Sequence, residues 1–237
     1  VRTTVNSTDE TFQELVVATS TSVAVQTTIH SPQLGTAAKF AILAGSTVSN
    51  AGLNTLVTGD IGNSPGVEFT GFSNKSFIGT ISLGLGTNAT QAKTDLALAV
   101  RQATEAPKSA SLTGVDLGGL TLQPGVYTFD STASIAAPSG QLTLNGSGVF
   151  IFQIGSALKT SLNSQVLLVN GALPQCVFWL IGSSAVLGSG CKFEGIIMAS
   201  ASIGFMDGAS LVGAAYAQNA AVTLINNVIT VRTACNL

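Results

Sequence analysis

An imperfect repeat of about 18 residues runs through the second half of the chain and restricts the folds that it can adopt. Each repeat holds three short apolar segments separated by Gly, Asn or Ser. One coil cannot bury its apolar side chains alone, whereas stacked coils share a continuous core, so the repeat predicts a β-solenoid. The best-aligned pairs of the last two coils are Phe193 with Leu211, Ile197 with Ala215, Met198 with Tyr216 and Ile203 with Val222.

The three coils upstream follow the same pattern with looser spacing. In the middle one, Val149 and Ile151 alternate with Phe150 and Phe152, so this strand is apolar on nearly both faces. Its outer face therefore needs a cover. The strands predicted for these coils are Leu120 to Leu122, Val126 to Phe129 and Ala133 to Ala136; Gln141 to Leu144, Val149 to Ile154 and Ala157 to Thr160; and Gln165 to Val169, Val177 to Ile181 and Ala185 to Leu187.

One helix is predicted, over residues 88–106. Small apolar side chains recur there every three or four residues, Thr87 or Asn88 can cap the start, and Pro107 stops the helix. A stripe of small residues lets the helix lie close against a flat apolar wall, so we expect it to cover the strands that are apolar on both faces. The stripe consists of Ala89, Ala92, Leu96, Ala99 and Ala103.

Charge and hydropathy exclude two classes of partner. Only 8% of the residues are charged, with 9 Lys and Arg against 11 Asp and Glu, so no basic surface exists to neutralise phosphates. The longest mainly apolar stretch, residues 166–187, is interrupted by Asn170, Pro174 and Gln175, which argues against a membrane-spanning helix of about 20 residues. We therefore expect neither a nucleic acid nor a membrane as partner.

Several features favour export from the cell. The chain begins at Val1 without a Met or an apolar leader, so we expect that any signal peptide was removed or never existed. Four Asn-x-Ser/Thr sequons predict a secreted protein that is glycosylated in a eukaryotic host, with Asn74, Asn88 and Asn145 exposed on turns. The sequons begin at Asn6, Asn74, Asn88 and Asn145.

Three cysteines, Cys176, Cys191 and Cys235, are too few for a disulfide scaffold. One disulfide with one free thiol, or no disulfide, are both compatible with the sequence. The 237 residues suit a single large domain. We divide the chain into an N-terminal extension rich in Thr, Ser and Val (1–33), the solenoid (34–231) and a C-terminal tail (232–237).

Six segments of the solenoid resemble, in the same order, the ice-binding (antifreeze) proteins of cold-adapted microbes. This resemblance implies an irregular right-handed parallel β-helix with one long α-helix packed alongside, whose N-terminal coil lies among later ones. It also implies adsorption to ice, thermal hysteresis and inhibition of ice recrystallisation. The segments are LGTAAKFAILAGSTVS (34–49), TGDIGNSPG (58–66), GGLTLQPGVYTF (118–129), VFIFQI (149–154), GCKFEGIIMAS (190–200) and VTLINNVITV (222–231).

Two stretches depart from the family pattern. The extension 1–33 has no counterpart in it, and residues 65–88 are short for the capping subdomain that some members insert there. An open coil end is an unpaired strand edge, so we expect the solenoid ends to be capped in another way.

The third segment of each coil carries small outward side chains, whereas the first two are bulky and apolar on much of both sides, which suits the core and the wall under the helix. The resemblance places the ice-binding surface on this third strand set, where Lys159 and Val186 interrupt any regular array of threonines. We therefore expect moderate activity. The predicted ice-binding residues are Thr47, Ser49, Thr132, Ser134, Ala136, Ala157, Lys159, Ser184, Val186, Ser202, Gly204, Ala221 and Thr223.

Motifs for catalysis or cofactor binding are weak. GLGTNA (84–89) fits a dinucleotide fingerprint, but no βαβ unit surrounds it, so we interpret it as a turn before a helix. His30, the only histidine, would have to carry any His-based triad or zinc site alone. A polysaccharide-cleaving solenoid needs paired acids, and no two acids of the solenoid beyond the helix are close in sequence. Those acids are Asp116, Asp130, Glu194 and Asp207.

We expect Glu194 at a coil corner and Trp179 in the core or under the helix rather than on a sugar-stacking platform. The sequence thus predicts a monomeric, non-enzymatic protein without cofactor or metal, whose partner is the ice surface. A secreted structural or adhesive solenoid, or a carbohydrate-binding one, is the alternative.

Overall fold

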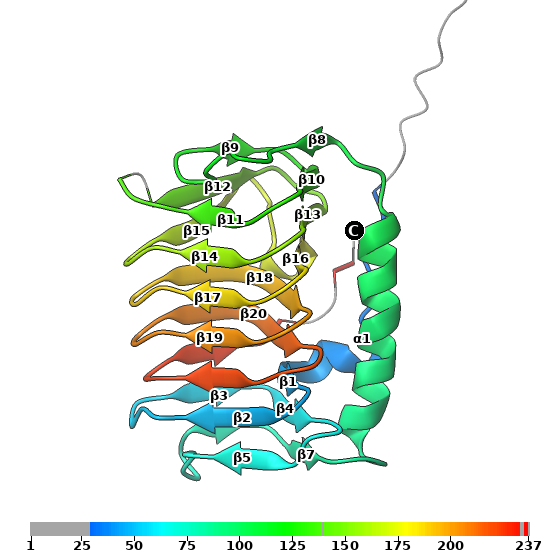
Figure 1. Cartoon of the computed structure of the whole chain (residues 1–237), viewed down its shortest axis with the longest axis vertical. Coiled ribbons are helices and arrows are strands. Elements are labelled where there is room, and N and C mark those ends of the chain that lie inside the picture. The colour runs from blue at the N-terminus through cyan, green and yellow to red at the C-terminus, as the bar shows by residue number, and fades with distance from the viewer. Residues whose placement is uncertain (1–28, 139, 233–234, 237) are drawn as a thin grey trace, which may run out of the picture.

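The computed structural model describes residues 29–138, 140–232 and 235–236, and their strands form a parallel β-helix with one α-helix alongside (Figure 1). Each coil contributes up to three strands, which stack into three walls. Asn6 and the first 28 residues of the extension lie outside the described residues. The fold class predicted from the sequence is confirmed.

The first wall and the helix-covered second wall form one sheet, because two long strands continue around the corner between them. These strands are β18 (Lys192–Ala199) and β20 (Ser210–Ala217). The first wall also contains β9 (Thr121–Leu122), β12 (Gln141–Asn145), β15 (Gln165–Val169), β22 (Val228–Thr230), β3 (Leu56–Thr58) and β6 (Phe77–Ile78). The second wall also contains β8 (Ala110–Ser111), β10 (Gly125–Phe129), β13 (Phe150–Ile154), β16 (Val177–Ile181), β1 (Phe40–Ala44), β4 (Asp60–Asn63) and β7 (Ile81–Leu83).

The third wall is a separate seven-stranded sheet, seen as the stack of arrows at the left of Figure 1. Its order shows that the N-terminal coil follows the C-terminal one, since β2 pairs with β21 on one side and with β5 on the other. In stacking order its strands are β11 (Ala133–Ile135), β14 (Leu158–Thr160), β17 (Ala185–Leu187), β19 (Ile203–Phe205), β21 (Val222–Leu224), β2 (Thr47–Asn50) and β5 (Glu68–Thr70).

The coil register agrees with the sequence repeat. Strands β18 and β20 pair in parallel over eight residues, and the four residue pairs aligned above are partners in the structure. Where these strands bend around the corner, Gly195 lies opposite Gly213, and both have positive φ. A Cβ atom on Gly213 would lie 1.9 Å from the Gly195 carbonyl oxygen, so only glycine fits there.

The interior of the coils is apolar and stacked. Phe152 lies parallel to Trp179 with 4.0 Å between ring centroids, and Tyr127 and Phe193 extend this column on either side. Trp179 is fully buried, as predicted, and its indole Nε1 donates to the Glu194 carbonyl oxygen at 3.0 Å. Each such aromatic pair adds about 0.5–1.5 kcal/mol beyond its buried area.

Helix α1 (Asn88–Glu105) runs along the second wall and carries the chain from one end of the stack to the other (Figure 1). Thr87 is its N-cap, and the predicted stripe of small residues is fully buried against the wall, together with Ile151 and Phe178 from the strands. Its 18 residues give about 27 Å of length, so it covers most of the roughly 38 Å spanned by the nine strands of the second wall at about 4.8 Å spacing.

Polar contacts fasten the helix to the coils. Lys93 Nζ donates to the carbonyl oxygens of Ala217, at 2.9 Å, and of Gln218, and burial lowers the pKa of Lys93 to about 8. Near the other end, Gln153 Nε2 donates to the Ala103 carbonyl oxygen at 2.7 Å, which satisfies one of the last helical carbonyls. A short 3-10 helix, η1 (Gly35–Lys39), precedes β1, and Tyr216 Oη donates to the carbonyl oxygen of Ala37 at 2.8 Å.

One expectation about the walls is wrong. The helix covers only the second wall, while the first wall faces outward without a cover among the described residues. Strand β12 alternates half-buried Gln141 and Thr143 with buried Leu142. On β15 and β22 of the same wall, Leu167 and Val228 are 40% and 46% exposed. Isolated apolar side chains at the surface concealed this alternation in the sequence.

Candidate functional site

The outward side chains of the third wall form a surface that we call the flat face. Its middle row contains one residue from each strand, and consecutive members are paired in register, so they stack at the strand spacing of about 4.8 Å. The buried alternate residues, such as Ile203 and Val222, fix this orientation, as predicted. From β11 to β5 the middle row is Ser134, Lys159, Val186, Gly204, Thr223, Ser49 and Thr70.

A second row lies two residues upstream, on the same face, where the strands begin. Ser184 Oγ and Ser202 Oγ are 3.0 Å apart in this row, and Thr47 pairs with Glu68. Ala136 lies two residues beyond Ser134 and is half-buried. The structure therefore brings all thirteen predicted residues to one face. In stacking order, the second row contains Thr132, Ala157, Ser184, Ser202, Ala221, Thr47 and Glu68.

Sequence reasoning missed the seventh strand of this face. Strand β5 has exposed Glu68 and Thr70 on either side of Phe69, the same outward–inward–outward pattern as its neighbours. Phe69 stacks on Phe72 at 4.4 Å between ring centroids and meets Phe77 edge-on, which closes this end of the core. The alternation of residues 68–70 was the only local signal for this strand, and the repeat of about 18 residues does not extend to it.

The opposite edge of the flat face is held by a loop. Asp116 Oδ1 accepts from the backbone N–H of Gly118 at 2.7 Å and of Ala136 at 3.0 Å, and Asp116 Oδ2 accepts from the Ser134 hydroxyl. The Leu117 N–H donates to the Ser134 carbonyl oxygen at 2.8 Å. This loop covers the edge of β11 and fixes its outermost side chain, and the Ser134 hydroxyl proton is directed toward Asp116 rather than to solvent.

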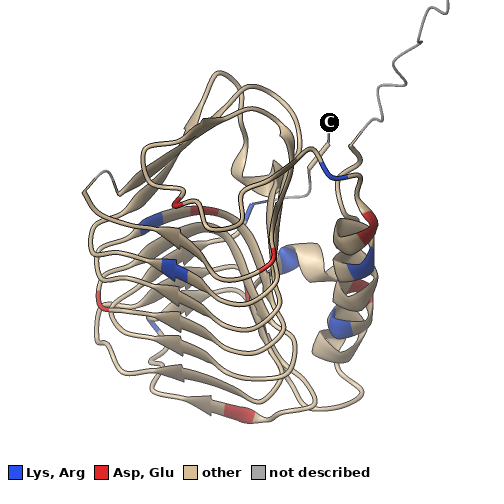
Figure 2. Ribbon diagram, turned by 45° about the horizontal axis from the view of Figure 1, so that its top comes forward, with Lys and Arg blue, Asp and Glu red and all other residues tan. Residues whose placement is uncertain are grey.

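The flat face carries little charge. Lys159 and Glu68 are its two charged residues, with Glu68 on the outermost strand, and charged side chains are sparse over the coils as a whole (Figure 2). None of the predicted ice-binding residues lines the open groove of about 610 Å³ between the helix and the second wall, whose lining includes Val100, Thr104 and Leu180.

The acids of the solenoid do not form a catalytic pair on this face. Asp116 holds the loop at the edge of β11, as described above, and Asp207 accepts a hydrogen bond from Asn226 Nδ2 at 2.7 Å. Glu194 lies within β18 and immediately precedes Gly195, where this strand bends from the first wall to the second. Burial raises the pKa of Glu194 to about 7, and Arg232 acts in the opposite direction. Within the described ranges, no three His, Cys, Asp or Glu side chains could hold a metal ion.

Comparison with known proteins identifies the family. Residues 42–230 match the family model described as Ice-binding-like. The ice-binding protein of Nostoc sp. (strain HG1) is 45% identical over 199 residues, which cover 82% of this chain and 72% of that protein. The ice-binding protein of Flavobacterium frigoris (strain PS1) is 32% identical over 213 residues, with 84% and 75% covered. The chain belongs to the ice-binding protein family.

Solved structures of ice-binding proteins have the same fold. One from an Antarctic Biological Consortium superposes with a TM-score of 0.81 at 39% identity, over 86% of this chain and 93% of that one. One from Antarctomyces psychrotrophicus gives a TM-score of 0.79 at 36% identity, over 86% of this chain and all of the other. The family predicted from the six sequence segments is confirmed.

The sequons of this family member differ in their surroundings. Asn74 and Asn88 are exposed, as expected, and Asn88 is the first residue of α1. Asn145 is half-buried rather than exposed, because the side chain of Asn170 in the next coil packs on it and donates through Nδ2 to Asn145 Oδ1 at 2.7 Å.

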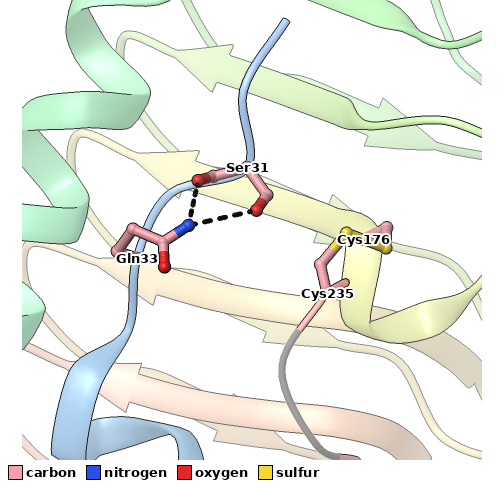
Figure 3. The surroundings of a disulfide bond; sticks show 4 residues. All are labelled: Ser31, Gln33, Cys176 and Cys235. Atoms are coloured by element: carbon pink, nitrogen blue, oxygen red, sulfur yellow. Dashed lines mark hydrogen bonds between the residues drawn. A yellow bond between two sulfur atoms is a disulfide. The ribbon is translucent and has the colours of Figure 1, made fainter. Parts of the chain in front are cut away.

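The cysteines form one disulfide and one free thiol. Cys176, in the 3-10 helix η2 (Pro174–Cys176), is bonded to Cys235 in the tail, and Cys191 is buried. Figure 3 shows that residues 31–33 pass close to this disulfide, between the helix and the coils. Of the helices in the described part of the chain, none is both long enough and apolar enough to cross a membrane.

Proposed function

We propose that this protein adsorbs to ice crystals through the flat face, and thereby causes thermal hysteresis and inhibits ice recrystallisation. The observation that carries the proposal is a face of seven paired strands, nearly uncharged and lined by small side chains, in a chain of the ice-binding family. The ligand residues are the thirteen predicted from the sequence, together with Thr70 on β5.

Ice offers neither charge nor side chains, only a lattice of water, so a binder must present many weak contacts in fixed positions. Rows of hydroxyl and methyl groups at about 4.8 Å intervals can hold surface water in a regular arrangement. Each held water contributes little, but the rows are fixed by buried neighbours such as Val48 and Ile203, so binding costs little conformational entropy. The contributions therefore add over the height of the face.

Low charge on the flat face supports the same function. Strongly hydrated ions would order nearby water around themselves rather than in a lattice. The exceptions are Lys159, exposed in the middle row, and Glu68, exposed on the outermost strand. Lys159 and Val186 limit the regular part of the middle row to the strands from β19 to β5. This arrangement supports moderate activity.

The protein acts on ice as a secreted monomer without a catalytic step, and neither nucleic acid nor membrane is its partner. Secretion is supported by the Cys176–Cys235 disulfide, because such bonds persist in oxidising compartments. In a eukaryotic host, glycosylation is expected at Asn74 and Asn88, and at Asn145 only before the coil closes around it.

The growth habit of single ice crystals tests the proposal. In a dilute solution of the purified protein, crystals held just below the melting point should develop facets and stop growing within a measurable temperature gap. Crystals that keep growing as unfaceted discs, in a sample shown to be folded by circular dichroism, would contradict ice binding.

A further inference from the structure

The turn that follows β15 has a backbone geometry with a chemical consequence. The Ala172 N–H donates to the Val169 carbonyl oxygen at 3.2 Å, and Asn170 and Gly171 between them have φ of +52° and +89°. These values define a type I′ turn, in which Asn-Gly is the preferred central pair. In such a turn only the N–H of the fourth residue, here Ala172, donates to the carbonyl oxygen of the first, here Val169. The N–H of the third residue, Gly171, points away from that oxygen.

Asn170 and Gly171 are both exposed, and the Gly171 N–H donates to no acceptor among the residues that the structure describes. We propose that Asn170 is a site of spontaneous deamidation, and that the coil structure selects it over the chain's other Asn-Gly pair.

The reaction needs water alone as co-reactant. The Gly171 nitrogen, after losing its proton to solvent base, bonds to Asn170 Cγ; the Cγ–Nδ2 bond breaks, and the amide nitrogen leaves as ammonia. Water then opens the resulting cyclic imide at either carbonyl, which gives aspartate or isoaspartate. Glycine at the second position leaves the attacking nitrogen unobstructed by a side chain.

The second pair, Asn145–Gly146, occupies the equivalent corner one coil away but differs in its contacts. The Gly146 N–H donates to the Val169 carbonyl oxygen at 3.1 Å, so its nitrogen is held in the coil-to-coil ladder. Asn145 is half-buried, and its Oδ1 accepts from Asn170. The side-chain hydrogen bond is shared by the two asparagines and restrains both, so the bonded Gly146 N–H is the contact that distinguishes the pairs: it opposes the movement that would bring Gly146 N to Asn145 Cγ.

Conversion of Asn170 removes the Nδ2 donor that contacts Asn145 Oδ1, and isoaspartate lengthens the backbone by one atom within the turn. The turn joins the first wall to the second, whereas the flat face is the third wall. The modification therefore leaves ice binding unchanged.

The experiment compares the two Asn-Gly pairs in one sample. The full chain, produced in a bacterial host, is incubated at mildly alkaline pH, digested, and analysed by mass spectrometry for conversion of –NH2 to –OH at each asparagine. Asn170 should convert at least about fivefold faster than Asn145. This ratio corresponds to the roughly 1 kcal/mol needed to break the hydrogen bond of the Gly146 N–H before its nitrogen can react.

The unfolded chain is the control. In concentrated guanidinium the coil contacts are absent, so both pairs should convert at similar rates. A fast Asn170 in the folded protein with equal rates in the unfolded protein supports the proposal. Equal rates or a faster Asn145 in the folded protein, or no conversion of Asn170 while the unfolded chain reacts, would overturn it.

Discussion

Gly204→Tyr offers the sharpest test of the flat face, because this position separates folding from binding. Gly204 lies at the centre of β19, its φ is not in the left-handed region, and a Cβ atom there would meet only Thr223 Oγ1, at an ordinary 3.5 Å. A tyrosine can therefore be added without displacing the backbone. Since glycine is unfavourable within strands, the unfolding free energy should be unchanged or rise by up to about 1 kcal/mol.

Binding should respond very differently. The ring projects from the face and overhangs β17 and β21, each about 4.8 Å away, so three of the seven strands lose contact with a flat lattice. Within the regular part of the face, which runs from β19 to β5, the ring leaves only β2 and β5 in contact, so the uninterrupted run falls from four strands to two. We expect loss of most of the thermal hysteresis at matched protein concentration, with a melting temperature that is unchanged or slightly raised.

Lys192→Tyr is the matched control, since Lys192 is exposed on the first wall and its substitution also adds one ring to a strand. It should retain nearly full hysteresis. If the Gly204 variant is folded and fully active, or if the Lys192 variant loses activity instead, the assignment of the face is wrong.

Four other predictions follow from particular contacts. Lys159→Thr removes the charge from the middle row and should raise thermal hysteresis; an unchanged or lower value would count against the role of low charge. Cys176→Ser opens a disulfide that spans 59 residues and should lower the unfolding free energy by about 4 kcal/mol on the chain-entropy model, measured by denaturant titration; equal stability would refute this. Burial raises the pKa of Glu194 from 4.5 to about 7, so its stability contribution is present below pH 4.5 and is lost as the pH rises through 7. Above pH 7 the Glu194→Gln variant should therefore be more stable than the unchanged chain by about 1 kcal/mol, a value that allows for solvent screening of this half-exposed group. Below pH 4.5 the two proteins should be equally stable. A stability difference that does not vary with pH would contradict the role of Glu194 burial. Deletion of residues 1–28 should leave hysteresis and melting temperature largely unchanged, and loss of activity in a folded truncation would show that they contribute to binding.

The sequence predicted the coils well where each residue's environment depends on near neighbours. In the third wall, alternation over three residues determines which side chains point inward, and the buried positions of Leu158, Ile203 and Val222 followed from it. The helix was equally predictable, because the periodicity of its small side chains and the stop at Pro107 are local signals.

Features that depend on distant contacts were not predictable in this way. Cys235 lies in the tail and reaches Cys176 across 59 residues, and no spacing rule distinguishes this pairing from one with Cys191. Strand β5 was missed because the cap that contains it lacks the repeat, and its position follows from pairing with β2. The insertion of the N-terminal coil was known only through the family resemblance.

That insertion has a consequence for how the flat face is built. Thr223 on β21 is paired with Ser49 on β2, and the neighbouring corner is joined by a hydrogen bond of 3.1 Å from Asn54 N to Asn226 Oδ1, residues 172 apart in sequence. The face is thus continuous across the two ends of the chain. Each half of the chain contains only part of the flat face. Pairing β2 with β21 closes a loop of about 170 residues, and contacts between such distant residues form slowly. Helix α1 makes this closure possible, because it carries the chain along the stack and lets the later coils run back until β21 meets β2. Helix, wall and face therefore form as one unit.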